Sequence, residues 1–465
     1  MDHFEFRPQA DGTARLFGEG VALEAIAESV GTPTYVYCAS TLRLHLRRLR
    51  EAFAALAPLI CFSVKCNSNL SVLRLLHEQG AGLDVVSGGE LFRARTAGVP
   101  PERIVFAGVG KSDEEIESAL GFTRRGVREH APIFAFNIES EPEFLNIAAH
   151  CRRLGVSTRA ALRINPDVDA RTHRYTTTGV KETKFGVPLD GARGFFERHG
   201  RDPLLRLTGL HLHLGSPIYS VEPYVEAIRR TLSLIDELHG AGFAIDTLDL
   251  GGGFGADYTT GQTIAADEYA RAIVPLLEER VRGGGSRPPL RIVLEPGRFI
   301  AASAGVLLTR VQYVKHADAS DPQSRTFVIC DAGMHTLLRP ALYEAFHFVH
   351  PARCAVEQAP QQRDEQPERP GYVRCDVVGP ICESSDFLAL GRWLPPVHRG
   401  DLLAVFTAGA YGMTMASRYN SHPLPAEVLV DGGAYRVVRR RETLEDLVRE
   451  EIESPGARSD EREGA

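Results

Sequence analysis

The sequence predicts an α/β fold, a (β/α)8 barrel of the TIM type combined with a second, mainly antiparallel β domain. Two observations predict the barrel: eight short apolar runs between residues 59 and 297 end in turn-type or polar residues, and segments with helical periodicity follow them. This alternation over about 250 residues is the pattern of a (β/α)8 barrel. A third observation predicts the β domain, because from about residue 306 the β-like runs succeed one another with little helix between them.

The predicted barrel strands are, in chain order, LICFSVK (59–65), GLDVVS (82–87), IVFAG (104–108), FAFNI (134–138), ALRINP (161–166), GLHLHLG (209–215), LDLGGG (248–253) and IVLEPG (292–297). Helices are predicted between them in SVLRLLHEQG, KSDEEIESAL, EPEFLNIAAHCRRLG and VEPYVEAIRRTLSLIDELHGAG. Ser112 and Glu115 have the spacing of a capping box, which favours the start of a helix at that point.

The β domain is predicted from the runs VLLTRVQYVKH, RTFVICDAG, GYVRCDVVGP, DLLAVFTAG and YRVVRRR. We expect the barrel to span residues 38–305, and the β domain to comprise residues 1–37 and 306–452. Residues 357–371 are polar and contain proline, so they are predicted to form an exposed loop insertion. Residues 453–465 have the composition of a disordered tail.

Composition and charge favour a cytoplasmic enzyme that acts on small molecules. The 465 residues are 43% hydrophobic and carry a net charge of −7 with both signs interspersed, whereas a nucleic-acid binder needs a basic stripe. No stretch approaches the roughly 18 apolar residues of a membrane span, and the first residues lack the pattern of a signal peptide. The eight cysteines contain no CxxC pair and are expected to be reduced thiols rather than disulfides or a zinc ribbon.

Polar or glycine residues follow several predicted strands at the same end. They are Lys65, Asp84, His213, Glu295 and the glycines 251–253. In a (β/α)8 barrel the carboxyl ends of the strands meet at one mouth, where active sites lie. The stem of Lys65 would then pack against apolar neighbours while its amine faces a ligand. A single lysine is more often a strand-end residue that reaches to solvent, but five punctuations at one end favour a site.

These groups together suit pyridoxal phosphate: a lysine forms the Schiff base, glycines let backbone amides approach the phosphate, a histidine covers one ring face, and a carboxylate keeps the pyridine nitrogen protonated. Taken singly, the glycines indicate only a tight turn and Glu295 only a salt bridge. His211 and His213 lie on the same strand face and are an alternative pair of zinc ligands. A metal-dependent hydrolase needs further His or Asp ligands, and the neighbouring strand ends offer mainly glycines and Glu295. No metal is therefore predicted, and His211 is left outside the predicted site.

Longer motifs extend from TPTYVY near the N-terminus to RRRETLEDLVREE near the C-terminus. They are FSVKCNSN, LDVVSGGEL, LRINPDVDARTH, KFGV, HLHLGS, LDLGGGFG, EPGR, DAGMHTLLRPALY, GPICESSDFLA and GAYGMTMASRYNSHPLPAEVLVDG. In these motifs the chain closely resembles the diaminopimelate decarboxylases, lyases of the alanine-racemase fold type that use pyridoxal 5'-phosphate. The resemblance covers nearly the whole chain. It implies decarboxylation of meso-2,6-diaminopimelate to L-lysine and CO2, the last step of lysine biosynthesis.

The resemblance also implies a role for individual residues. Lys65 is implied to form the Schiff base and Cys382 to protonate the carbanion after CO2 leaves. Contacts to the cofactor are implied for Asp84, His213, Ser216, Gly251, Gly252, Gly253, Glu295, Gly297, Arg298 and Tyr411, and substrate recognition for Arg298, Arg339, Tyr343, Glu383 and Tyr411. In this family the segment with Cys382 and Glu383 comes from the other subunit, which implies a homodimer with shared active sites.

The substrate can be argued from charge. A distal carboxylate calls for the bidentate guanidinium of Arg339 or Arg298, and a distal ammonium for an acidic partner such as Glu383. A substrate without the distal carboxylate would leave the arginines unpaired, which is strongly disfavoured. Two alternatives stay open: a decarboxylase of the same fold for ornithine, arginine, lysine or a carrier-bound amino acid, and a catalytically inactive relative. Cys66 after Lys65, the long 357–371 loop and the extended tail depart from the family pattern but remove no catalytic residue.

Overall fold

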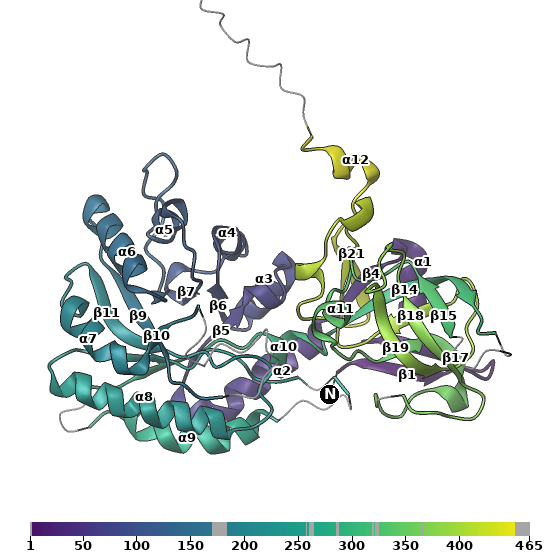
Figure 1. Ribbon diagram of the computed structural model, residues 1–465, viewed down its shortest axis with the longest axis horizontal. Helices are drawn as coiled ribbons and strands as arrows, with labels where there is room; N and C mark the ends of the chain where they lie inside the picture. Colours follow the sequence, from purple (N-terminus) through teal and green to yellow (C-terminus); the bar gives the residue numbers. More distant parts are fainter. Residues whose placement is uncertain are drawn as a thin grey trace, which may run out of the picture.

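The computed structural model describes residues 2–169, 184–256, 258–259, 265–284, 288–318, 320, 325–364 and 366–451 (Figure 1). It has two parts that lie side by side, a helix-covered barrel and a domain of β-sheets. Part of the motif LRINPDVDARTH and the expected tail at 453–465 fall outside the described residues.

The first part is a closed parallel barrel, which confirms the predicted fold class. Each predicted run forms a strand, neighbouring strands pair in parallel, and β8 pairs with β9 to close the barrel. A short strand β10 (Val187–Pro188) adds to β9 outside the ring. The barrel strands are β5 (Leu59–Ser63), β6 (Gly82–Val85), β7 (Ile104–Phe106), β8 (Ala135–Ile138), β9 (Thr158–Asn165), β11 (Leu205–His211), β12 (Thr247–Asp249) and β13 (Arg291–Leu294).

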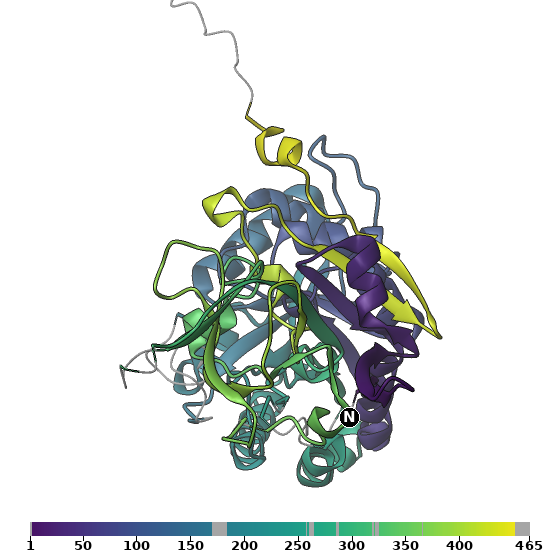
Figure 2. The ribbon, with the colours of Figure 1, turned by 90° about the vertical axis from the view of Figure 1, so that its right-hand side faces the viewer.

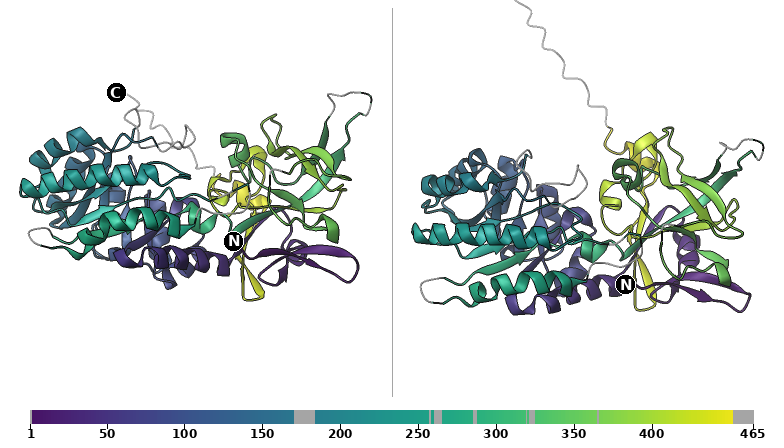
Figure 3. Two further views of the ribbon diagram at one scale, coloured as in Figure 1. Left: turned by 90° about the horizontal axis from the view of Figure 1, so that it is seen from below. Right: turned by 60° about the horizontal axis from the view of Figure 1, so that its bottom comes forward.

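Helices cover the outside of the barrel. The predicted capping box is confirmed at α5 (Asp113–Ala119), where the Ser112 Oγ accepts from Glu115 N at 3.3 Å and the Glu115 carboxylate accepts from Ser112 N at 2.9 Å. The longest of the described helices, α8 and α9, pack against each other along the outside of the barrel (Figure 3). The other helices of this part are α2 (Ala39–Ala52), α3 (Leu70–Glu78), α4 (Gly88–Thr96), α6 (Glu141–Leu154), α7 (Leu189–His199) and α10 (Arg298–Ala301), and α8 and α9 span Glu222–Gly240 and Ala266–Arg282.

The second part is mainly antiparallel, as predicted, and it contains strands of the N-terminal segment. Its long strand β14 pairs antiparallel with β4, β15 and β20, whereas β15–β18 and β4–β21 are parallel pairs. The strands are β1 (Phe4–Pro8), β2 (Thr13–Gly18), β3 (Val21–Ala22), β4 (Thr34–Cys38), β14 (Gly305–Lys315), β15 (Thr326–Cys330), β16 (Val349–Pro351), β17 (Arg353–Ala355), β18 (Val373–Val378), β19 (Phe387–Leu394), β20 (Leu402–Val405), β21 (Ala426–Asp431) and β22 (Ala434–Arg439). Short helices α1 (Leu23–Val30), α11 (Arg339–Tyr343) and α12 (Leu444–Val448) accompany them.

The predicted loop at residues 357–371 is more firmly anchored than its composition indicates. Gln366 is buried, and its side-chain amide donates to the Val349 carbonyl oxygen at 2.7 Å and accepts from Val349 N at 3.3 Å. Arg363 binds Asp2 and donates to the Phe4 carbonyl oxygen at 3.0 Å. Most described residues of 357–371 are exposed or half-buried, and two polar side chains tie this loop to β16 and to the N-terminal strand.

The β domain reaches back to the barrel beside the carboxyl ends of its strands. Figure 2, seen from the side of the β domain, shows the barrel helices behind it. The loop after β20 makes the connection: Tyr411 N donates to the Cys66 carbonyl oxygen at 2.7 Å, and Asn67 Nδ2 donates to the Gly409 carbonyl oxygen at 3.0 Å. The mouth of the barrel is thus walled by both parts of the chain. In the described part of the chain, no helix combines the length and apolar character needed to cross a membrane.

Candidate active site

Lys65 lies at the barrel mouth, two residues beyond the end of β5, in the short 3-10 turn Val64–Cys66. Its Nζ donates to the Asp84 Oδ2 at 2.6 Å, and Ser63 Oγ donates to the same oxygen at 2.8 Å. Burial opposes the charge on Lys65, but Asp84 and Glu295 outweigh burial and raise the pKa of the amine. Burial and Glu295 raise the pKa of Asp84, which makes Asp84 the neighbouring base able to accept a proton from Lys65.

His213 projects from the loop after β11. Gly252 N donates to its Nδ1 at 3.3 Å, so Nδ1 is the acceptor and the ring carries its proton on Nε2. Burial, Arg163 and Lys65 lower the pKa of His213 well below its usual value. The imidazole is therefore neutral, and a neutral ring can lie flat against an aromatic ligand without adding a buried charge.

The glycines 251–253 pack backbone against backbone between neighbouring loops. A Cβ at Gly251 would lie 2.1 Å from the Leu212 carbonyl oxygen, and one at Gly252 would lie 2.3 Å from the Glu295 carbonyl oxygen. Gly251 also has a φ of +65°, which side chains rarely adopt. These residues are glycines because the loops after β11, β12 and β13 approach so closely, and that approach leaves only backbone on this side of the mouth.

A cavity of about 400 Å³ opens beside these groups. Six residues predicted from the sequence line it: His213, Ser216, Arg298, Arg339, Tyr343 and Tyr411. Six further lining residues were not predicted: Pro217, Tyr219, Tyr258, Thr259, Ala345 and Phe346. Tyr258 and Tyr219 sit in short loops whose sequences resemble ordinary turns, so only the folded arrangement reveals them.

Two buried guanidiniums meet around Tyr258 in this cavity. Arg298 NH1 donates to the Tyr258 hydroxyl at 2.8 Å, its Nε donates to Ser216 Oγ at 3.0 Å, and its guanidinium lies 4.8 Å from the centre of the Tyr411 ring. The Arg339 guanidinium lies 4.4 Å from the centre of the Tyr258 ring. Burial raises the pKa of the Tyr258 hydroxyl, but the two arginines outweigh burial, so the pKa is lowered.

Arg339 is held by a neutral histidine rather than by an acid. Its NH1 lies 2.9 Å from His347 Nε2, and His347 Nδ1 lies 2.9 Å from the Phe406 carbonyl oxygen. Burial and Arg339 lower the pKa of His347 to about 3, so the ring accepts from the guanidinium and donates to the carbonyl. Arg339 Nε is buried without a hydrogen-bond partner. Among the described residues, no carboxylate forms an ion pair with Arg298 or Arg339.

Cys382 and Glu383 do not line the cavity of their own chain. Both are exposed, in the loop between β18 and β19. The Asn420 Oδ1 accepts from Cys382 N at 3.3 Å and lies 3.2 Å from Cys382 Sγ, and the Tyr419 hydroxyl donates to the Glu383 carboxylate. Asn420 adopts a φ of +50°. The two predicted residues are thus held on the surface by the segment that contains Tyr419 and Asn420.

The pair of histidines considered as zinc ligands is not formed. His211 points to Glu295, with Nε2 to Oε2 at 3.4 Å, whereas His213 faces Gly252. His211, Asp249 and Glu295 do bring ligand atoms within 4.8 Å of one another. Asn137 Nδ2, however, donates to both carboxylates, at 3.2 Å and 3.1 Å. A donor directed at both acids occupies the oxygens that a cation would need, so this cluster suits protons rather than a metal.

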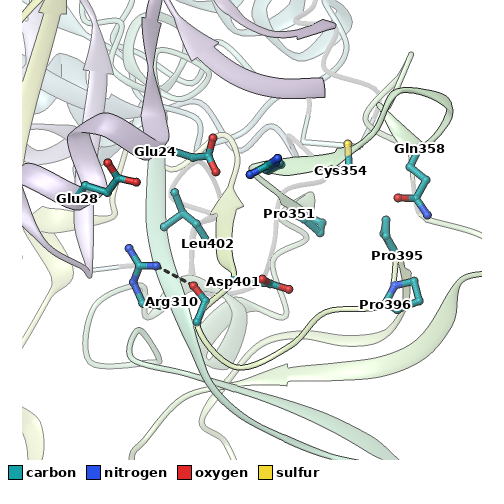
Figure 4. A pocket seen from close by; sticks show the side chains of 12 residues that line it. Glu24, Glu28, Arg310, Pro351, Cys354, Gln358, Pro395, Pro396, Asp401 and Leu402 are labelled. Atoms are coloured by element: carbon teal, nitrogen blue, oxygen red, sulfur yellow. Dashed lines mark hydrogen bonds between the residues drawn. The ribbon is translucent and has the colours of Figure 1, made fainter. Parts of the chain in front are cut away.

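A second cavity, of about 240 Å³, lies in the β domain (Figure 4). Both of its arginines have partners of their own: Arg310 NH1 donates to the Gly400 carbonyl oxygen at 2.7 Å, and Arg353 binds Asp11 at 3.0 Å. None of the residues predicted for the site line this cavity. The predicted site residues that line a cavity therefore lie at the barrel mouth.

The groups at the mouth fit pyridoxal phosphate. They comprise the Lys65 amine beside Asp84, the neutral imidazole of His213 and the buried carboxylate of Glu295. Two arginines without carboxylate partners among the described residues, Arg298 and Arg339, complete the set. Residues 39–302 match the family described as pyridoxal-dependent decarboxylase, pyridoxal binding domain. The chain belongs to this class of enzymes, and its cofactor is pyridoxal phosphate.

Relatives that match nearly the whole chain indicate which family of decarboxylases it belongs to. A diaminopimelate decarboxylase of Pseudomonas aeruginosa is 45% identical over 447 residues, which cover 96% of this chain and 98% of the relative. A crystal structure of diaminopimelate decarboxylase from Helicobacter pylori complexed with L-lysine is 38% identical, covers 92% of this chain and 99% of that one, and has a TM-score of 0.80. The M. jannaschii enzyme in complex with L-lysine is 33% identical with a TM-score of 0.85 over 98% of both chains. The chain belongs to the diaminopimelate decarboxylase family.

Proposed function

We propose that the protein decarboxylates meso-2,6-diaminopimelate to L-lysine and CO2, using the residues at the barrel mouth. The observation that carries the choice of substrate is the pair of buried guanidiniums, Arg298 and Arg339, which have no carboxylate partner among the described residues. A buried cation without an anion is costly, so the cavity favours a ligand that presents a carboxylate there. Lysine, ornithine and arginine have no distal carboxylate and would leave this wall unpaired.

Several residues would hold the cofactor. Lys65 would attach it covalently through its amine, with Asp84 accepting the proton that the amine must lose. The neutral His213 ring would cover one face, and the ionised Glu295 would hold a proton on the ring nitrogen. Ser216, Gly251, Gly252, Gly253, Gly297 and Tyr411 are proposed to form the remaining contacts. When bound, pyridoxal phosphate supplies an electron-withdrawing ring that stabilises the charge left on the substrate carbon as CO2 departs.

A proton must reach that carbon before lysine is released, and Cys382 is proposed to deliver it. Cys382 and Glu383 are exposed and lie outside the cavity of their own chain, which supports a homodimer in which each subunit completes the site of its partner. Glu383 would then face the distal ammonium of the substrate, and Tyr343 would join the arginines at its distal carboxylate. The proposal also places the enzyme in the cytoplasm, since its eight cysteines are unpaired and seven of them are buried.

The test is CO2 release and product identity with purified protein, pyridoxal phosphate and meso-diaminopimelate, beside lysine, ornithine and arginine. We expect lysine to form from diaminopimelate and the other three amino acids to stay unchanged. Lys65→Ala is the control, because it removes the amine that holds the cofactor while leaving the cavity lining intact. A protein that binds the cofactor yet decarboxylates ornithine or lysine in preference to diaminopimelate would overturn the substrate assignment.

A further inference from the structure

Beneath the predicted cofactor site, the ends of three adjacent strands bring ionisable groups into one buried cluster. His211 ends β11, Asp249 ends β12 and Glu295 follows β13. The register pairs His211 with Asp249 and Asp249 with Val293, so Glu295 stands two residues nearer the mouth. His211 and Asp249 are each 1% exposed and Glu295 is 2% exposed. The two residues of the lower layer therefore support Glu295 from beneath.

The two carboxyl groups share one hydrogen-bond donor, and neither accepts a hydrogen bond from a described lysine or arginine. Asn137 Nδ2 donates to Asp249 Oδ2 at 3.2 Å and to Glu295 Oε1 at 3.1 Å, and Gly251 N donates to Asp249 Oδ1 at 2.9 Å. Lys65 gives its hydrogen bond to Asp84 instead. Two carboxylates confined in one buried site cannot both stay ionised, so one of them must carry a proton.

The surroundings decide which carboxyl group carries the proton. Glu295 lies 3.4 Å from His211 Nε2 and feels the charge of Lys65, and these two groups lower the pKa of Glu295 against the effect of burial. Asp249 receives only neutral N–H donors, and burial together with Glu295 raises its pKa well above the usual value. The proton thus belongs on Asp249 and the negative charge on Glu295.

The remaining ionisable groups around the cluster do not reverse this assignment. Burial, followed by the negative charge of Glu295, raises the pKa of Cys61 of β5, so its thiol stays neutral. Asp84 of β6 adds a further acid that already pairs with Lys65. Neither group supplies a positive charge to Asp249.

We propose that Asp249 carries the proton shared by the two acids and, together with Asn137 and His211, holds Glu295 ionised and directed at the cofactor ring. Asp249 is thus a positioning residue that acts through Glu295, and its effect on the cofactor rests on the proposed function of Glu295. The assignment of the proton itself concerns the protein alone. It can be tested without the reaction.

The first test compares Asp249→Asn with the wild type. Asparagine has the shape of a protonated aspartic acid but no proton to lose. Because folding raises the pKa of Asp249, its protonated form stabilises the wild type below about pH 4, and this contribution is lost as pH rises from there toward the folded pKa, whereas Asp249→Asn lacks this pH dependence. The ratio of the two unfolding constants should therefore change by up to tenfold per pH unit. Thermal midpoints are measured from pH 5 to pH 8, with and without cofactor. The midpoint of the variant minus that of the wild type should increase as pH rises.

Asp431→Asn is the matched control for this test. Asp431 binds Arg43 through two hydrogen bonds of 2.7 Å, and those bonds lower the pKa of its carboxyl group. It is ionised over the whole range, so its difference from the wild type should not change with pH. If Asp249→Asn behaves like this control, Asp249 is ionised in the folded protein and the proposal is wrong.

The second test measures the effect on the cofactor and uses Asp249→Ser, which removes the carboxylic acid group. Asp249→Ser should weaken cofactor binding at least tenfold and shift the pH dependence of the visible absorption of the holoenzyme, whereas Asp249→Asn should stay within about threefold of the wild type. Infrared spectra add a readout on the proton: Asp249→Ser should lose a carbonyl band of a protonated carboxylic acid that the wild type has at pH 8. Unchanged cofactor affinity and an unchanged band in Asp249→Ser would overturn the proposal, whatever substrate the enzyme accepts.

Discussion

At the residue scale, Arg339 is buried without a carboxylate partner among the described residues. Its contribution to substrate binding can therefore be measured by substitution. Its guanidinium packs on Tyr258 and binds the neutral His347, but no carboxylate among the described residues neutralises it. The free enzyme tolerates this cation because water and a ligand can reach it through the cavity. Once a substrate carboxylate binds, the pair is charged and shielded from solvent, which is where a hydrogen-bonded ion pair is strongest.

We therefore expect Arg339→Gln to lower kcat/KM for diaminopimelate by about 100-fold to 1,000-fold, roughly 3 to 4 kcal/mol, because truncating one side of a buried ion pair costs about 2 to 5 kcal/mol. Most of the loss should appear in KM. Steady-state kinetics provide the measurement, with Arg353→Gln in the β domain as a control that should leave both constants unchanged. An equal loss in Arg353→Gln would indicate that general destabilisation, not recognition of the carboxylate, is responsible.

At the element scale, the segment Tyr419–Ser421 forms a support for the loop that carries Cys382. The Asn420 side-chain oxygen faces both the backbone N–H and the thiol of Cys382, and Asn420 and Ser421 both have positive φ, +50° and +59°. Non-glycine residues adopt this conformation at a cost of about 1 kcal/mol or more, which proteins retain mainly at functional sites. The strain thus accompanies the placement of a proposed proton donor.

Asn420→Ala should lower kcat about tenfold with little change in KM for diaminopimelate, because the thiol loses its acceptor and its fixed position, and a lost hydrogen bond costs about 1 kcal/mol or more. Asn420→Gly separates the two effects, since glycine accepts the positive φ without strain. If the side chain matters, both variants lose kcat alike while Asn420→Gly is the more stable in thermal unfolding. Wild-type kcat in both would exclude a role for Asn420.

The elements of the barrel were predictable because each strand is a short apolar run that ends in a turn, a local signal. The identity of Lys65 as a mouth residue followed from that signal, although it lies in a turn beyond its strand. Tyr258, Asn137 and Asp249 were missed because their roles depend on contacts between elements distant in sequence. The anchoring of the loop at 357–371 was not predicted for the same reason, since Gln366 binds the backbone of β16.

At the scale of the whole molecule, the proposed site needs residues that lie outside the cavity of their own chain. The cavity holds the cationic wall, whereas Cys382 and Glu383 are exposed in a loop of the β domain and line no part of it. Two copies related by a two-fold axis can each offer this loop to the mouth of the other, since a residue that contacts its partner's site is itself contacted in the same way. Activity should then depend on both subunits at once.

Mixing two inactive variants tests this dependence. Lys65→Ala removes the cofactor amine and Cys382→Ala removes the proposed proton donor, so each homodimer should have little activity. In a mixed dimer, the mouth with Lys65 meets the loop with Cys382 at one of the two sites. Random exchange of equal amounts makes half of the dimers mixed, so we expect about a quarter of the wild-type activity to return. If both residues acted within one chain, no mixed dimer would contain an intact site, and activity would not recover. Size-exclusion chromatography establishes that dimers are present, and recovery of both variants through an affinity tag carried by one of them separates a failure to exchange from a failure to complement.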